Sequence, residues 1–134
     1  KPLRSQDYLL FKHAPRKVVI AGDNDRPELL AQACAGAQVL VHEATYTEAM
    51  AEKAGEVGHS YGKQVAAFAE QVTLPNLVLT HFSPRYPLIS HISPSIEDIR
   101  KEAQSVYSGT LYMARDFGEY SLDKAGHFSE LAGE

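Results

Sequence analysis

Acidic and histidine side chains stand at the ends of short apolar runs in this sequence. Asp23 follows the first run, and His81 closes the third. The second run ends on His42 and is followed by Glu43. In open α/β sheets, ligands bind outside the carboxyl ends of the strands, so we expect these side chains to share one site, joined by His59 from a loop. The runs are Lys17–Gly22, Gln38–His42 and Leu77–His81.

These residue types favour metal-assisted phosphoester chemistry. Asp and His are ligands suited to Zn²⁺ or Mn²⁺, and a carboxylate can bridge two ions about 3.5–4 Å apart, which activates water. A Glu oriented towards a His forms a proton relay, because the carboxylate fixes the tautomer of the imidazole. Arg85, which follows His81 in the next loop, is suited to bind a phosphate with two hydrogen bonds.

Each candidate also has a simpler interpretation. Asp23 suits a turn or a helix cap, His42 a half-buried histidine with its own hydrogen bonds, and Glu43 a solvated charge. His59 would then be an ordinary loop residue. His81 is harder to dismiss, because an imidazole at the end of an apolar strand needs a partner. The combination of these residues, more than any one of them, favours a site.

The elements that position these residues alternate between strands and helices, which predicts an α/β fold with largely buried strands. The helices are expected to begin at N-cap residues. Residues 1–16 are interpreted as a leading strand plus a loop, and residues 123–134 as a flexible tail. The expected helix caps are Asp25, Thr45, Ser60 and Ser93, and the expected late strands are Thr110–Ala114 and Glu119–Leu122, joined at Asp116-Phe117-Gly118.

Composition places the chain among globular domains. Its 134 residues are enough for one domain with a core, and 44% hydrophobic and 22% charged residues exclude a disordered or fibrous chain. A net charge of −4 disfavours broad, charge-driven binding to nucleic acid or to an anionic membrane. The chain opens on Lys1-Pro2 without an initiator Met, which favours a piece of a longer protein.

The sequence carries no sign of export or of a membrane anchor. A single cysteine, Cys34, excludes an internal disulfide and a cysteine-based metal site, so no oxidising compartment is implied. No apolar run approaches the length of a membrane span, and the N-terminus lacks the hydrophobic stretch of a signal peptide. A cytoplasmic protein without membrane contact is therefore expected.

Four segments resemble, in order, the second half of ribonuclease Z, the family of tRNA 3′-processing endonucleases in the metallo-β-lactamase superfamily. The late segment Ala114-Arg115-Asp116-Phe117 resembles the closing motif of the same family. The resemblance runs from about Lys17 to Leu122, and the order of the motifs makes it specific. The four segments are Gly22-Asp23-Asn24, His42-Glu43-Ala44-Thr45-Tyr46, Gly58-His59-Ser60 and Leu79-Thr80-His81-Phe82-Ser83-Pro84-Arg85-Tyr86.

The resemblance implies a role for each motif residue. Asp23 would bridge two zinc ions, and His81 would ligate one of them. Glu43 and His59 would form the relay that protonates the leaving oxygen. The remaining candidates are Arg85 and Ser83 for binding phosphate and His42 for orienting the cluster; Asn24 departs from the Thr that many members carry.

The resemblance also implies that this chain is incomplete. The family's His-x-His-x-Asp-His motif, a further ligand histidine and an arm that holds tRNA belong to the first half of the fold, and the chain has no His-x-His pair. Asp23 and His81 alone cannot complete the site. We therefore expect residues 1–134 to be a single C-terminal portion, half of a four-layer αββα sandwich, which binds Zn²⁺ weakly and is inactive alone.

Three functions are compatible with these motifs. The first is an endoribonuclease that cleaves precursor tRNA with water activated by two zinc ions, or by Mn²⁺. The second is another hydrolase of the superfamily, acting on small phosphodiesters, sulfate esters or lactones. The third is a non-catalytic α/β module that binds a partner. A half-sandwich would expose an apolar sheet face, so self-association into a homo-oligomer is expected.

Overall fold

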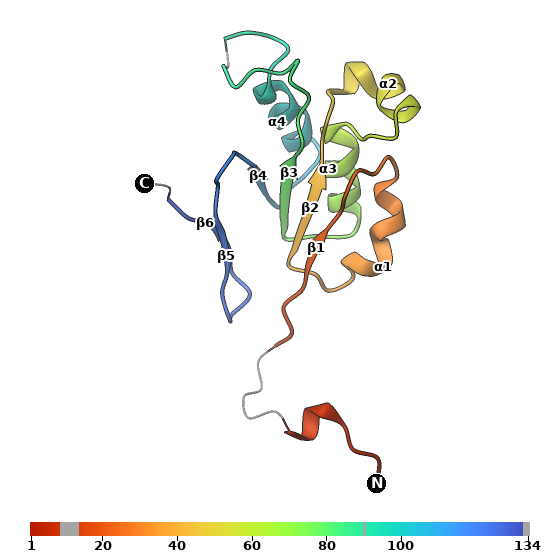
Figure 1. Ribbon diagram of the computed structural model, residues 1–134, viewed down its shortest axis with the longest axis vertical. Helices are drawn as coiled ribbons and strands as arrows, with labels where there is room; N and C mark the ends of the chain where they lie inside the picture. Colours follow the sequence, from red (N-terminus) through yellow and green to blue (C-terminus); the bar gives the residue numbers. More distant parts are fainter. Residues whose placement is uncertain (9–13, 90, 133–134) are drawn as a thin grey trace.

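A parallel four-stranded sheet forms the centre of the molecule (Figure 1). The computed structural model describes residues 1–8, 14–89 and 91–132. The strand order is β1-β2-β3-β4, the same as the order along the chain, and every neighbouring pair is parallel. The strands are β1 (Val18–Ile20), β2 (Val39–Glu43), β3 (Asn76–Thr80) and β4 (Thr110–Met113).

Helices connect successive strands. Right-handed crossovers in a sheet with sequential strand order place all the connecting helices on one face. The α-helices are α1 (Ala31–Cys34), α2 (Ala51–Glu56), α3 (Gly62–Gln71) and α4 (Ile96–Gln104). Short 3-10 helices are η1 (Ser5–Tyr8), η2 (Pro27–Leu30) and η3 (Glu48–Met50).

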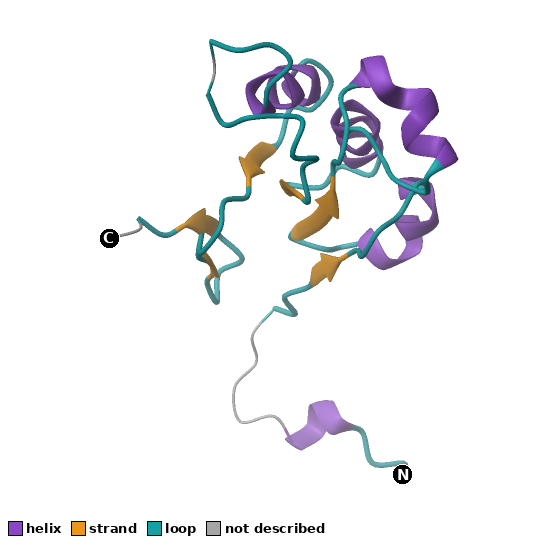
Figure 2. Ribbon diagram, turned by 45° about the horizontal axis from the view of Figure 1, so that its top comes forward, coloured by secondary structure: helices purple, strands orange, loops and turns teal. Residues whose placement is uncertain are grey.

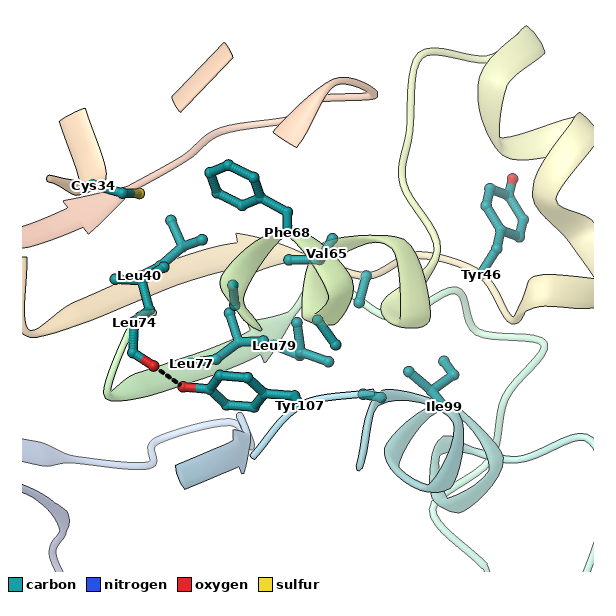
Figure 3. Close-up of a cluster of buried hydrophobic side chains, with 14 of the residues drawn as sticks. Cys34, Leu40, Tyr46, Val65, Phe68, Leu74, Leu77, Leu79, Ile99 and Tyr107 are labelled. Atoms are coloured by element: carbon teal, nitrogen blue, oxygen red, sulfur yellow. Dashed lines mark hydrogen bonds between the residues drawn. The ribbon is translucent and has the colours of Figure 1, made fainter. Parts of the chain in front are cut away.

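The hydrophobic core lies between the sheet and these helices (Figure 3). Alternate strand residues, Leu40, Leu77 and Leu79, point into this core and are fully buried. Val39 and Val78 lie outside this core and are buried too. Gly62, the first residue of α3, allows close packing against α4, since a Cβ there would lie 2.5 Å from a methyl carbon of Ile99. The core residues from the helices are Cys34, Val65, Ala66, Phe68, Ala69, Ile99 and Ala103.

The other face of the sheet is only partly covered. Ile20 of β1 is 76% exposed, whereas Tyr112 of β4 packs edge-on against two aromatic rings. Those rings, Tyr120 and Phe128, stack on each other in the antiparallel hairpin of β5 (Tyr120–Leu122) and β6 (Phe128–Glu130). Figure 2 shows this hairpin on the side away from the helices. The sheet therefore has one helix-covered face and one face left open at β1.

The α/β class and the three strands that carry the candidate residues are confirmed within a residue or two at each end. The two expected late strands are present as β4 and β5, each within a residue of the predicted bounds. They belong to separate sheets, and β5 pairs with β6. The segment expected to be a flexible tail, residues 123–134, thus contains a strand that the prediction omitted. Part of the expected leading strand, residues 9–13, lies outside the described residues, and Tyr8 ends a 3-10 helix.

The predicted helix caps are wrong in detail. Helix α4 starts later than expected, with Ser95 as N-cap and the Asp98 carboxylate 2.7 Å from the Ser95 amide nitrogen. Thr45 and Ser60 do not cap helices; both turn their hydroxyls towards the loops at the strand ends. Within the described residues, no helix has the length and apolarity needed to cross a membrane.

Candidate metal centre at the strand ends

The loops that follow β1, β2 and β3 meet at one edge of the sheet. Parallel strands bring their carboxyl ends to the same edge, which is why residues far apart in the sequence become neighbours there. Asp23 follows β1, Glu43 ends β2, and His81 comes directly after β3. His59 enters from the loop before α3. The structure thus brings together the four residues that the sequence singled out for metal and proton chemistry.

Glu43 is the centre of the buried part of this site. Its side chain is 2% exposed, yet both carboxylate oxygens accept hydrogen bonds. Oε1 accepts from the Ser60 amide at 2.7 Å and lies 3.2 Å from His59 Nδ1. Oε2 accepts from the Thr45 amide at 3.0 Å and from the Thr45 hydroxyl at 2.8 Å. These donors offset the cost of burying the Glu43 carboxylate.

His42 is completely buried and belongs to the same layer. Its Nδ1 donates to the Glu43 carbonyl oxygen at 2.7 Å, and its Nε2 lies 3.1 Å from the Asn24 amide nitrogen, which can donate to it. Burial lowers the pKa of His42 and so favours the neutral ring that this arrangement requires. His42 thus contacts the residue next to Asp23. We call His42, Glu43, Thr45 and Ser60 the inner layer.

Asp23, His59 and His81 form an outer layer, in which Asp23 and His81 are exposed and His59 is partly buried. The side chains of Asp23 and His81 are 66% and 53% exposed, with 3.8 Å between Asp23 Oδ1 and His81 Nε2. The rings of His59 and His81 lie 5.4 Å apart between centroids. One ligand atom from each of the three residues falls within 4.8 Å of the others. One oxygen and two imidazole nitrogens are a donor set that fits Zn²⁺ or Mn²⁺.

His59 therefore stands in two groups at once. The sequence assigned it to a relay with Glu43, and the 3.2 Å contact brings that pair together. It also lies in the cluster that could hold a metal ion, a position that the sequence did not assign to it. With Nδ1 directed at Glu43, Nε2 is the nitrogen left for either purpose.

The two candidates for phosphate binding lie in the loop after His81. The Arg85 guanidinium carbon is 5.3 Å from the centroid of the Tyr46 ring, a cation–π contact, and that ring packs edge-on to His59. Ser83 Oγ accepts from the Arg85 backbone amide at 3.4 Å, a long contact within its own loop. Arg85 is thus linked to the outer layer through Tyr46, and the backbone amide of Ser83 donates to the Thr45 carbonyl oxygen at 3.1 Å.

The sequence did not identify three residues as part of the site. Thr45 and Ser60 were interpreted as helix caps, and Tyr46 received no role. The available signal was position: Thr45 is two residues after Glu43, and Ser60 directly follows His59. A hydroxyl at such a strand end has a buried carboxylate within reach, and only the folded chain shows which acceptor it finds.

The chain is similar to curated ribonuclease Z proteins from several bacteria. It is 50% identical to that of Marinobacter nauticus over 123 residues, 91% of this chain and 38% of that protein. It is also 50% identical to one from Pseudomonas putida over 125 residues, covering 92% of this chain and 39% of that protein. The chain thus spans about two fifths of the length of these relatives. No protein-family profile matches it.

Solved structures agree with the sequence relatives. The short form of human tRNase Z superposes with a TM-score of 0.54 at 34% identity, over 76% of this chain and 32% of that one. The Bacillus subtilis metallo-beta-lactamase fold protein YhfI superposes with a TM-score of 0.59 at 21% identity, over 84% of this chain and 39% of that one. This likeness supports the fold alone. The chain is therefore a homologue of part of ribonuclease Z and has part of the metallo-β-lactamase fold.

Proposed function

We propose that this chain is the C-terminal portion of a ribonuclease Z-like, metal-dependent endoribonuclease that cleaves phosphodiester bonds in precursor tRNA. The observation that carries the proposal is the cluster of Asp23, His59 and His81, with ligand atoms within 4.8 Å beside the buried Glu43. The identity of about 50% to proteins named ribonuclease Z supports the same assignment. A cytoplasmic location follows from the proposed substrate.

In this proposal, Asp23 and His81 help to hold two metal ions. We take these ions to be Zn²⁺, with Mn²⁺ as the alternative. The bound ions would supply Lewis-acid stabilisation of phosphate charge and an activated water. Asp23 has two carboxylate oxygens and is mostly exposed, so both oxygens would be available to metal ions. Among the described residues, the cluster that could hold metal consists of Asp23, His59 and His81. The further ligands for a pair of ions would come from the remaining three fifths of a ribonuclease Z-length protein.

The proton chemistry would belong to Glu43 and His59. Glu43 accepts from Nδ1 of His59 and thereby directs Nε2 towards the outer layer. A protonated His59 would be stabilised by this carboxylate and could give its Nε2 proton to the leaving oxygen. Arg85, and with it Ser83, would bind the phosphate, and His42 would hold the loop of Asp23 through Asn24.

The proposed RNA partner must be held mainly outside this chain. The net charge of −4 gives little general attraction to a polyanion, so Arg85, the metal ions and the remainder of the protein would carry the contact. This chain alone is expected to be inactive. Its open sheet face at β1 would also favour self-association into a homo-oligomer when the chain is isolated.

The test is to incubate the full-length gene product with two substrates, precursor tRNA and bis(p-nitrophenyl) phosphate, and to measure the cleavage of each. Site-specific cleavage of the precursor, lost on chelation and restored by Zn²⁺, would support the proposal. A His-x-His-x-Asp-His motif encoded upstream of Lys1 would support it independently. Absence of precursor cleavage by a folded, metal-loaded protein would contradict it.

The same experiment separates a second candidate, a small-molecule hydrolase of the metallo-β-lactamase fold. The observation that keeps this candidate open is the fold, which the chain shares in part with YhfI at a TM-score of 0.59. That likeness extends to the fold alone, whereas the relatives at 50% identity are all named ribonuclease Z. Hydrolysis of the small diester without cleavage of precursor tRNA would favour the second candidate.

A further inference from the structure

The Thr45 hydroxyl lies between the two layers of the site. Thr45 is 6% exposed and belongs to the loop that follows β2. Its Oγ1 lies 2.8 Å from Glu43 Oε2, 3.0 Å from His81 Nδ1 and 3.1 Å from the His81 carbonyl oxygen. It is therefore the direct contact between the buried carboxylate and the exposed histidine.

The number of available hydrogens decides the direction of these contacts. A threonine hydroxyl has one hydrogen to donate. Glu43 Oε2 and the His81 carbonyl oxygen can only accept, so they share the one hydrogen of the Thr45 hydroxyl. Oε2 also accepts from the Thr45 amide at 3.0 Å. Nothing then remains for the hydroxyl to donate to His81 Nδ1. At 3.0 Å, Nδ1 must instead carry the hydrogen and donate it to Thr45.

We propose that Thr45 is a positioning residue that holds His81 in the Nδ1–H tautomer, so that the Nε2 lone pair faces Asp23. The proposal rests on the proposed function only in taking His81 as a metal ligand. A histidine ligand binds metal through an unprotonated nitrogen, and the hydrogen bond on its other nitrogen selects which one that is. Thr45 makes that hydrogen bond here.

The backbone of His81 supports the same role. His81 has φ = +59°, in the left-handed region that few residues other than glycine adopt, directly after β3 ends at Thr80. Its carbonyl oxygen accepts from Thr45 Oγ1, so the same hydroxyl contacts both the ring and the main chain of His81. Two contacts to one residue define the ring orientation as well as its tautomer.

One buried carboxylate then sets both imidazoles. Glu43 Oε1 binds Nδ1 of His59 directly, and Oε2 binds Thr45, which binds Nδ1 of His81. In each ring, Nδ1 is used on the protein side and Nε2 is left for the outer layer. Thr45 extends the reach of Glu43 to a histidine that the carboxylate does not contact in the described structure.

The test is the tautomer of His81 in the metal-free, full-length gene product, read from the imidazole nitrogen shifts by NMR at a pH where the ring is neutral. His81→Gln identifies the signals by their loss. The wild type should show a protonated Nδ1 and an unprotonated Nε2. An Nε2–H tautomer in the folded wild type would overturn the proposal without the need for any variant.

Variants then separate positioning from packing. Thr45→Val should shift His81 towards the Nε2–H form, whereas Thr45→Ser should keep the wild-type tautomer. Thr47→Val is the matched control, because Thr47 is 5% exposed and its hydroxyl contacts Tyr86, not His81. In titrations with Zn²⁺ alone, Thr45→Val should bind Zn²⁺ about 10-fold or more weakly than the wild type. Thr45→Ser should bind it with the affinity of the wild type.

An unchanged tautomer in a folded Thr45→Val, or failure of a folded Thr45→Ser to restore it, would contradict the proposal. Neither readout depends on cleavage. If the protein fails to cleave precursor tRNA while the tautomer follows Thr45, the proposed function fails and the role of Thr45 stands.

Discussion

The inner and outer layers of the site lie a few ångströms apart and differ in almost every physical respect. Glu43 is 2% exposed and accepts hydrogen bonds on both oxygens, whereas the side chains of Asp23 and His81 are 66% and 53% exposed. The inner layer is held by short contacts of 2.7–3.0 Å from Ser60 and Thr45. The outer pair has a single ionic contact at 3.8 Å.

The difference shows how the site divides its tasks. Buried polar groups need all their partners, so the inner layer is constrained and defines geometry. Exposed groups remain hydrated and keep free lone pairs, so the outer layer can bind a metal ion or substrate. Substitutions of His42, Glu43 or Ser60 should therefore act on stability, and substitutions in the outer layer on ligand binding. Substitutions of Thr45, which contacts both layers, should act on both.

Glu43→Gln should have the largest effect. The amide keeps the shape but places an NH₂ group against backbone or hydroxyl donors that a carboxylate oxygen satisfied. Leaving such buried donors unpaired should lower the free energy of unfolding by about 3 kcal/mol. Urea unfolding measures it, with exposed Glu28→Gln as the control, expected within about 0.5 kcal/mol of wild type. A Glu43→Gln variant that unfolds within about 0.5 kcal/mol of wild type would remove the distinction between the layers.

Asp23→Asn should show the opposite pattern. Losing a charged ligand should weaken Zn²⁺ binding to the full-length gene product at least 10-fold, or about 1.4 kcal/mol. The unfolding free energy of the metal-free protein should stay within about 0.5 kcal/mol, because Asp23 is exposed. Calorimetric titration and urea unfolding give the two values, with exposed Asp7→Asn as the control. A large loss of stability with unchanged Zn²⁺ affinity would place Asp23 in the inner layer instead.

His42 should make stability depend on pH. Burial lowers its pKa in the folded protein, so the unfolded chain binds this proton more tightly. The stability contributed by neutral His42 is present above about pH 6.5, the ordinary value, and is lost as pH falls towards the lower folded pKa. Urea unfolding at pH 7.5 and 5.5 should show the loss. His42→Gln should reduce this loss of stability, whereas His91→Gln, an exposed control, should leave it unchanged. An equal loss of unfolding free energy between the two pH values in all three proteins would refute the role of His42.

Ile20→Thr should have the smallest effect on folding. Ile20 is 76% exposed on the open face, so its loss should change the unfolding free energy of the isolated chain by less than about 0.5 kcal/mol. The same change should reduce self-association measured by sedimentation. Leu40→Thr, fully buried on the helix-covered face, should instead destabilise the chain by about 3 kcal/mol. A monomeric wild-type chain would contradict the self-association part.

Residue type and spacing along the chain were enough to determine the α/β class and the strand-end positions of Asp23, Glu43 and His81. Their signals are local: apolar runs of strand length, helical stripes such as Val65, Phe68 and Ala69, and motifs of a few residues. The tail strand β6 gave no such signal, because a short, half-exposed strand becomes recognisable only when it pairs with β5.

Only the tertiary structure decided what each polar side chain contacts. Thr45 satisfies the sequence pattern of a helix cap, yet its hydroxyl finds Glu43 and His81, the latter 36 residues away. His59 joins a carboxylate 16 residues earlier and also the metal-competent cluster. A hydroxyl or an imidazole has several possible partners of similar strength, and the parallel register of β2 and β3 selects among them by distance.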